Sequence, residues 1–271
     1  MFAVIAVKLI ATASVVIGVT LAVSKLGPRL GGIIAGTPII LGPGYFFMLQ
    51  ERPVEFIQSA ALSTLHALIA TLVFSICFVM TAGRLSALAS LGLATMCWIP
   101  FTLIFSATPG GVWGAVLLYC LVLLVAEVIR RKLKLGQPIV IARSGWFDLL
   151  LRGLMAGVLV SIATTVAARS GPFLSGVLVG FPVGLFTIGL TLHQRYGPLV
   201  ARATVTIAQK GMLSLVAFSL VLALTVGKLP PMVTFTVSLV ASLLVSAVLF
   251  LISQWQFRRA YALLPLPEET P

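Results

Sequence analysis

Two stretches of this sequence, "KLGPRLGGIIAGTP" from Lys25 to Pro38 and "RSGPFLSGVLVGFP" from Arg169 to Pro182, are variants of one motif. They align without a gap at a spacing of 144 residues, and six of their fourteen positions are identical. The alignment continues to Phe74-Ser75, which falls over Phe218-Ser219. This match predicts that the chain arose by an internal duplication.

The composition predicts a membrane protein. Of the 271 residues, 60% are hydrophobic and 9% are charged, which is too few charges to cover the surface of a soluble domain. Because a membrane-spanning helix needs about 20 apolar residues, we expect an all-α, polytopic transmembrane bundle of about nine spans. The predicted apolar segments are 2–26, 30–50, 54–82, 85–106, 111–131, 147–168, 173–194, 199–226 and 232–254.

The polar break between the copies divides the chain. We expect a first membrane repeat at 1–131 with five spans, a cytoplasmic linker at 132–146, and a second repeat at 147–259 with four spans. A proline-containing tail follows at 260–271. Because an odd number of spans precedes the second copy, the copies are expected to lie in inverted topology, as in many secondary transporters. A miscount by one span would make the repeat parallel.

The basic residues predict the orientation. With nine spans and the N-terminus outside, twelve Lys or Arg residues fall on the cytoplasmic side and three on the outer side. We therefore expect a multi-pass protein of the cell inner membrane, with a cytoplasmic C-terminus. The outer residues are Arg52, Arg169 and Lys228; the cytoplasmic ones are Lys25, Arg29, Arg84, Arg130, Arg131, Lys132, Lys134, Arg143, Arg195, Arg202, Arg258 and Arg259.

A resemblance supports this architecture. An intramembrane cation, a first span, a G-x-x-x-x-x-P segment and then "LHQRYGPLVARATVTIAQKGMLSLVAF" together resemble the small bacterial GlpM-like membrane proteins. Those proteins look like a single repeat of about four spans. The resemblance covers the first three or four spans of each half, and it implies an integral membrane protein without an assigned chemistry.

The repeated motif supports two interpretations that are compatible with each other. Both copies contain GxxxG, which allows close helix packing in lipid. Each also has a proline two residues later, and proline interrupts a helix by removing a backbone donor. In a membrane, an interrupted helix is tolerated only inside the protein or along a wet cavity, and paired interruptions indicate a transporter binding site. The candidate site residues are Gly36, Pro38, Gly180 and Pro182.

Four basic residues inside the predicted spans complete the candidate site. His66 aligns with Lys210 about twelve residues into a span, which is near the bilayer centre. Lys8 aligns with Arg152 nearer to a span end, where snorkelling to the headgroups is the alternative role. No carboxylate is expected at the same depth, so these residues would attract an anion.

We therefore expect a secondary transporter for a small organic anion, in which proton coupling through His66 is an open option. The alternatives are a non-transporting scaffold or accessory subunit, and a flippase for lipids or lipid-linked precursors. No motif of a hydrolase, metalloprotease or P-loop enzyme is present, so we expect no enzyme activity, metal or cofactor. The net charge of +12 is explained by topology, and nucleic acid is not an expected partner. The sequence is compatible with a monomer or a homodimer in the lipid bilayer.

Overall fold

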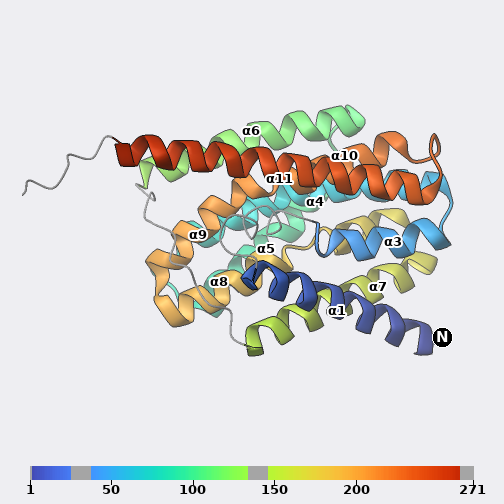
Figure 1. Ribbon diagram of the computed structural model, residues 1–271, viewed down its shortest axis with the longest axis horizontal. Helices are drawn as coiled ribbons and strands as arrows, with labels where there is room; N and C mark the ends of the chain where they lie inside the picture. The colour runs from blue at the N-terminus through green and yellow to red at the C-terminus, as the bar shows by residue number, and fades with distance from the viewer. Residues whose placement is uncertain (1, 26–37, 134–145, 263–271) are drawn as a thin grey trace, which may run out of the picture.

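The computed structural model describes residues 2–25, 38–133 and 146–262, and within these ranges the chain is helical and contains no strand (Figure 1). The predicted all-α class is therefore confirmed. The helices are α1 (Phe2–Lys25), α3 (Leu41–Glu51), α4 (Val54–Thr81), α5 (Ala87–Ser106), α6 (Gly111–Lys132), α7 (Trp146–Val179), α8 (Val183–Tyr196), α9 (Pro198–Gly211), α10 (Leu213–Thr225) and α11 (Pro231–Ala262).

The helix ends are set by residues that stop or start helices well. Ser86 precedes α5 and accepts a hydrogen bond from the backbone N–H of Ala89 at 3.3 Å, which is an N-cap. Pro198 and Pro231 are the first residues of α9 and α11, where the missing N–H of proline has no intrahelical partner to lose. Gly110 precedes α6 with φ of 99°, a conformation that favours glycine.

Helix α4 lies at the centre of the bundle. It packs against α5, α6, α7, α9 and α10, and its middle residues 63–72 are all buried. Around it, α10 packs on α11, α8 on α9, and α3 on α7 and α11. Helix α6 lies at the edge of the bundle (Figure 1), and six of its large apolar side chains are exposed.

Six helices or helix pairs are long and apolar enough to cross a membrane, judged by length and composition. This supports a multi-pass membrane protein, while the count of nine spans stays a prediction. Three further predicted segments, 2–26, 30–50 and 147–168, are not among the six. They contain α1, α3 and the first part of α7. The apolar helix described in each is shorter than the 18 residues required. The six are Val54–Thr81, Ala87–Ser106, Gly111–Lys132, Gly171–Tyr196, Pro198–Thr225 and Pro231–Trp255.

The loops gather at two opposite ends of the bundle (Figure 1). At one end the α4–α5 turn meets α8 and α9: the His193 Nε2 atom lies 2.9 Å from the carbonyl oxygen of Ala82, and the Arg202 Nε atom donates to the carbonyl of Val79 at 2.7 Å. At the other end Gly227 lies against Val54. Residues 134–145 of the predicted linker and most of the predicted tail lie outside the described residues.

Candidate functional site

The predicted interruption at Pro182 is present. Helix α7 ends at Val179, α8 begins at Val183, and Pro182 lies between them with no side chain capping the new helix. Helix α7 also contains a break at Gly171, whose φ of 81° and ψ of 176° are not helical. The second half thus contains a short helical segment, residues 172–179, bounded by a glycine break and a proline break. We call residues 180–182 the α7–α8 break.

Helix α4 covers the segment that leads to this break. The Thr64 hydroxyl donates to the carbonyl of Gly176 at 2.8 Å, and the Tyr45 hydroxyl lies 2.6 Å from the Thr64 oxygen. An added Cβ at Gly176 would stand 2.2 Å from the carbonyl oxygen of Ala60, and one at Gly180 would stand 2.7 Å from Ala67 Cβ. The packing interpretation of the second GxxxG motif is therefore confirmed, together with the interruption that follows it.

Helix α5 forms another wall of the break. The Trp98 indole N–H donates to the Thr71 hydroxyl at 3.1 Å and approaches the carbonyl of Ala67 at 3.3 Å. The Trp98 ring also meets the Phe181 ring edge to face, with 5.2 Å between centroids. The break is thus held inside protein, which is the condition under which irregular backbone is stable at membrane depth.

The first half brings a second helix N-terminus to the same place. Pro38 is buried, its carbonyl accepts from the N–H of Gly42 at 2.6 Å, and α3 begins at Leu41 without a side-chain cap. Gly44, in the first turn of α3, packs directly on Val179: an added Cβ there would stand 3.0 Å from Val179 Cγ1. Gly36, the fourth predicted motif residue, lies outside the described residues.

These two N-termini determine what the arrangement can do. The first turn of a helix carries a partial positive charge and N–H groups that bind anions. Beside the α8 N-terminus there is also space, because a Cβ added to Gly184 would meet no heavy atom within 4 Å. At the start of α3, however, the N–H groups of Gly42 and Gly44 donate to the carbonyls of Pro38 and Ile40, and Pro43 has no N–H. The start of α8 is therefore the better place for a small anion.

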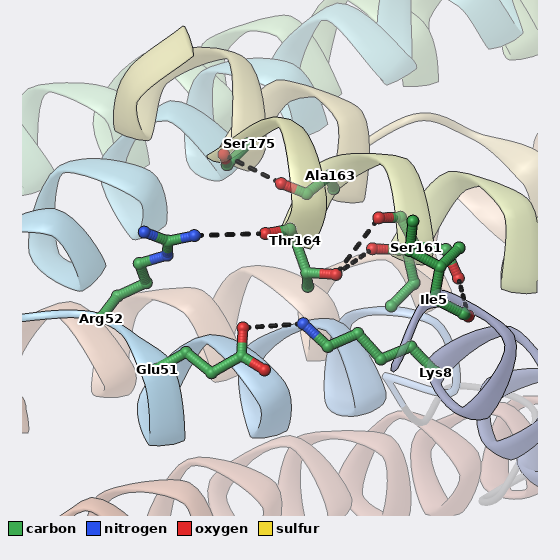
Figure 2. A network of polar contacts seen from close by, with 9 residues as sticks. Ile5, Lys8, Glu51, Arg52, Ser161, Ala163, Thr164 and Ser175 are labelled. Carbon is green, nitrogen blue, oxygen red and sulfur yellow. Dashed lines mark hydrogen bonds and ion pairs between the residues drawn. The ribbon is translucent and has the colours of Figure 1, made fainter. Parts of the chain in front are cut away.

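Lys8 does not belong to this centre, and the expectation that it has no acidic partner is wrong. Its Nζ atom lies 2.7 Å from Glu51 Oε2, at the last residue of α3, and the Lys8 side chain is 6% exposed (Figure 2). The Lys8 ammonium also lies 5.7 Å from the centroid of the Phe47 ring. Next to Glu51, the Arg52 guanidinium points toward α7, where Nη2 approaches the carbonyl of Thr164 at 3.5 Å. These contacts tie α1, α3 and α7 together at one end.

Lys210 also has an acidic partner and faces outward. Its side chain is 54% exposed, and its Nζ atom lies 3.7 Å from Glu127 Oε2 on α6. The prediction of no carboxylate at this depth is therefore wrong for Lys210 as well. A lysine side chain is long and can extend along the helix surface. The ammonium of Lys210 therefore need not lie at the bilayer depth that its position in the span predicts.

His66, which aligns with Lys210, is 4% exposed on α4, and its Nε2 atom has no hydrogen-bond partner among the described residues. It remains a candidate for a role that needs a buried imidazole. The fourth predicted cation, Arg152, belongs to α7, and its side chain lies outside the described residues. The structure thus places Gly180 and Pro182 in the α7–α8 break and Pro38 just before α3, whereas Lys8 and Lys210 pair with acidic residues elsewhere.

Sequence reasoning did not find the hydroxyl groups that hold the break. Thr64 and Thr71 lie seven residues apart on α4, and this spacing places both on one face of a helix. In a membrane helix, two hydroxyl residues on one face are a signal for contact with backbone carbonyls of a neighbouring helix. Nor does the sequence indicate that Glu51 and Glu127 each lie beside a cation from a distant helix, Lys8 and Lys210 respectively.

Comparisons with protein families, with curated proteins and with solved structures found no match. The GlpM-like resemblance therefore remains an expectation from the sequence, and the function rests on the chain itself.

Proposed function

We propose that the protein is a secondary transporter for a small organic anion, which binds at the α7–α8 break beside the N-terminus of α3. The observation that carries this proposal is the contact between Gly44 and Val179, because it places the first turn of α3 beside the last residue of α7, four residues before α8 begins. In such transporters the N-terminus of a half-helix that follows a break points at the anionic group of the substrate. The anion is thus held by backbone groups, without Lys8 or Lys210.

An inverted relation between the two halves is part of the proposal, and the contact between α1 and α7 supports it. A Cβ at Gly157 would stand 2.7 Å from the carbonyl oxygen of Leu9, and one at Gly153 would stand 3.2 Å from that of Ala13. Shifted by 144 residues, Leu9 becomes Gly153 and Ala13 becomes Gly157, so each contact is the image of the other. The two helices run antiparallel, as a two-fold axis perpendicular to them requires.

A second observation supports the duplication. Helices α4 and α5 begin at Val54 and Ala87, and α9 and α11 begin 144 residues later, at Pro198 and Pro231. Four buried positions of α5 also fall over four buried positions of α11 under this shift. The buried positions are Ser90, Ala94, Trp98 and Thr102 in α5, and Thr234, Ser238, Ser242 and Ser246 in α11. Helix α6 is then the span without a counterpart.

The proposed orientation, with the C-terminus in the cytoplasm, follows the distribution of basic residues. Arg84, Arg130, Arg131, Arg195 and Arg202 lie at or near one end of the bundle, at the ends of α4, α6 and α8 and the start of α9. Arg52 and Lys228 lie at the other end. Cytoplasmic ends carry more Lys and Arg, so the first end is assigned to the cytoplasm.

The test is uptake by proteoliposomes that contain the purified protein, measured with labelled acetate, lactate and succinate in exchange against the unlabelled anion. We expect one of these anions to exchange, and Gly184→Leu to abolish exchange by filling the space beside the α8 N-terminus. Gly92→Leu is the matched control, because a Cβ at Gly92 also meets nothing within 4 Å but lies on α5. Exchange by folded Gly184→Leu at the wild-type rate would contradict the site, and no exchange of any anion by the wild type would favour the scaffold.

A further inference from the structure

One carboxylate on the outside of the bundle holds three cations. Glu127 accepts two hydrogen bonds from the Arg130 guanidinium, one of them at 2.8 Å from Nε, and a further one from Arg131 Nε at 3.0 Å. Lys210 reaches the same carboxylate from α9, with Nζ 3.7 Å from Oε2. We call these four residues the Glu127 cluster. Its formal charge is +2, so the single carboxylate arranges the cations without neutralising them.

The two other acidic side chains that the structure describes, those of Glu51 and Glu55, lie too far away to supply the missing negative charge. Glu51 and Glu55 lie at the other end of the bundle, beside the end of α3 and the start of α4. Glu127 itself lies five residues before the end of α6, about 8 Å along the helix axis. The excess positive charge of the cluster therefore attracts an anion from outside the chain.

The cluster is open to the surroundings, and an apolar surface adjoins it. The Arg131 side chain is 75% exposed and that of Lys210 is 54% exposed. Starting one turn away, the outer face of α6 is a continuous row of exposed apolar side chains. The row consists of Trp113, Leu117, Leu121, Leu124 and Val128. A ligand that satisfies both surfaces has an anionic head and a long apolar tail.

We infer that an anionic phospholipid binds here, with its phosphate at Arg131 and Lys210 and its acyl chains along the outer face of α6. The cations lie near the end of a helix on the lipid-facing side, which is where basic residues recognise anionic headgroups. A free anion would use the same charges but not the apolar row. This site is separate from the α7–α8 break and does not depend on transport.

The test is native mass spectrometry of the detergent-solubilised protein titrated with phosphatidylglycerol, with phosphatidylcholine as the uncharged comparison. We expect bound phosphatidylglycerol, and affinity about fivefold weaker for each lost cation, the usual contribution of one Lys or Arg near an anionic headgroup. Arg131→Gln with Lys210→Gln should therefore weaken binding about 25-fold. Arg84→Gln is the matched control, since Arg84 is an exposed cation at the same end but outside the cluster.

A second variant keeps the inference testable if the double variant fails to fold. Lys210→Glu makes the cluster neutral while leaving Arg130 and Arg131 in place, and circular dichroism checks that it remains helical. If either cluster variant bound phosphatidylglycerol as tightly as the wild type does, the inference would be overturned. It would also be overturned if the wild type bound phosphatidylcholine as tightly as phosphatidylglycerol. If inorganic phosphate displaces phosphatidylglycerol at equal concentration, the apolar row contributes nothing and the lipid assignment is wrong.

Discussion

Substituting Gly176 with alanine tests how closely the second GxxxG segment packs on α4. The new Cβ would stand 2.2 Å from the carbonyl oxygen of Ala60, whereas real Cβ atoms essentially never come closer than 3.0 Å. The helices must therefore separate by roughly 0.8 Å at this point, and overpacking of this kind costs about 1–3 kcal/mol. The shift also weakens the hydrogen bond from Thr64 to the Gly176 carbonyl, which is worth about 1 kcal/mol.

Alanine is a better helix former than glycine by about 1 kcal/mol, which offsets part of this loss. We therefore expect Gly176→Ala to lower the free energy of unfolding by about 2 kcal/mol, measured by reversible unfolding in mixed micelles with increasing dodecyl sulfate. Gly92→Ala is the control, because it gains the same propensity and meets no neighbour. If Gly176→Ala proved as stable as Gly92→Ala, the close approach of α7 to α4 would be refuted.

Three further predictions use other contacts. Glu51→Gln leaves the buried Lys8 ammonium without its carboxylate and should lower the free energy of unfolding by about 2 kcal/mol, most of which Lys8→Met in the same chain should restore; an unaffected Glu51→Gln protein would contradict a stabilising pair. Trp98→Phe removes the indole hydrogen bonds beside the break and should cost about 1 kcal/mol in the same assay, so unchanged stability would argue against them. Single cysteines at Arg202 and Lys228, in a chain without its natural cysteines, should react with an impermeant maleimide from opposite faces of the membrane, and labelling from one face would exclude the proposed topology.

Helix positions could be predicted from the sequence because apolar runs, and the proline, glycine and polar residues between them, are local signals. The segment predicted at 54–82 is the helix Val54–Thr81, and the one predicted at 111–131 is Gly111–Lys132. The interruption at Pro182 was predictable for the same reason, since proline acts on its own backbone. These inferences needed no knowledge of which helix lies beside which.

The charged part of the candidate site was not predictable, because it depends on contacts between distant helices. Lys8 and Glu51 are 43 residues apart in sequence, and only the packing of α1 on α3 brings them together. Depth along a span did not reveal which way Lys210 faces, since residues one position apart on a helix point in directions about 100° apart. An acidic residue near a helix end can pair with a cation from another helix. Spacing along the sequence does not reveal such a pair, because it identifies only partners within one helix.

The two hydroxyl contacts along α4 differ in length, so the two sides of the α7–α8 break are held to α4 unequally. Thr64 holds the Gly176 carbonyl at 2.8 Å, whereas Thr71 gives its single hydrogen to Ala67 at 2.9 Å and lies 3.5 Å from the Gly180 carbonyl. Residues 172–179 are therefore anchored to α4 beside the break, whereas α8 is tied at its far end, where the His193 Nε2 atom lies 2.9 Å from the carbonyl oxygen of Ala82. Helix α8 has 14 residues and is about 21 Å long. Rotation by about 10° at Gly180 would carry its far end about 4 Å and would break the contact with Ala82, so any movement of α8 must also displace the α4–α5 turn.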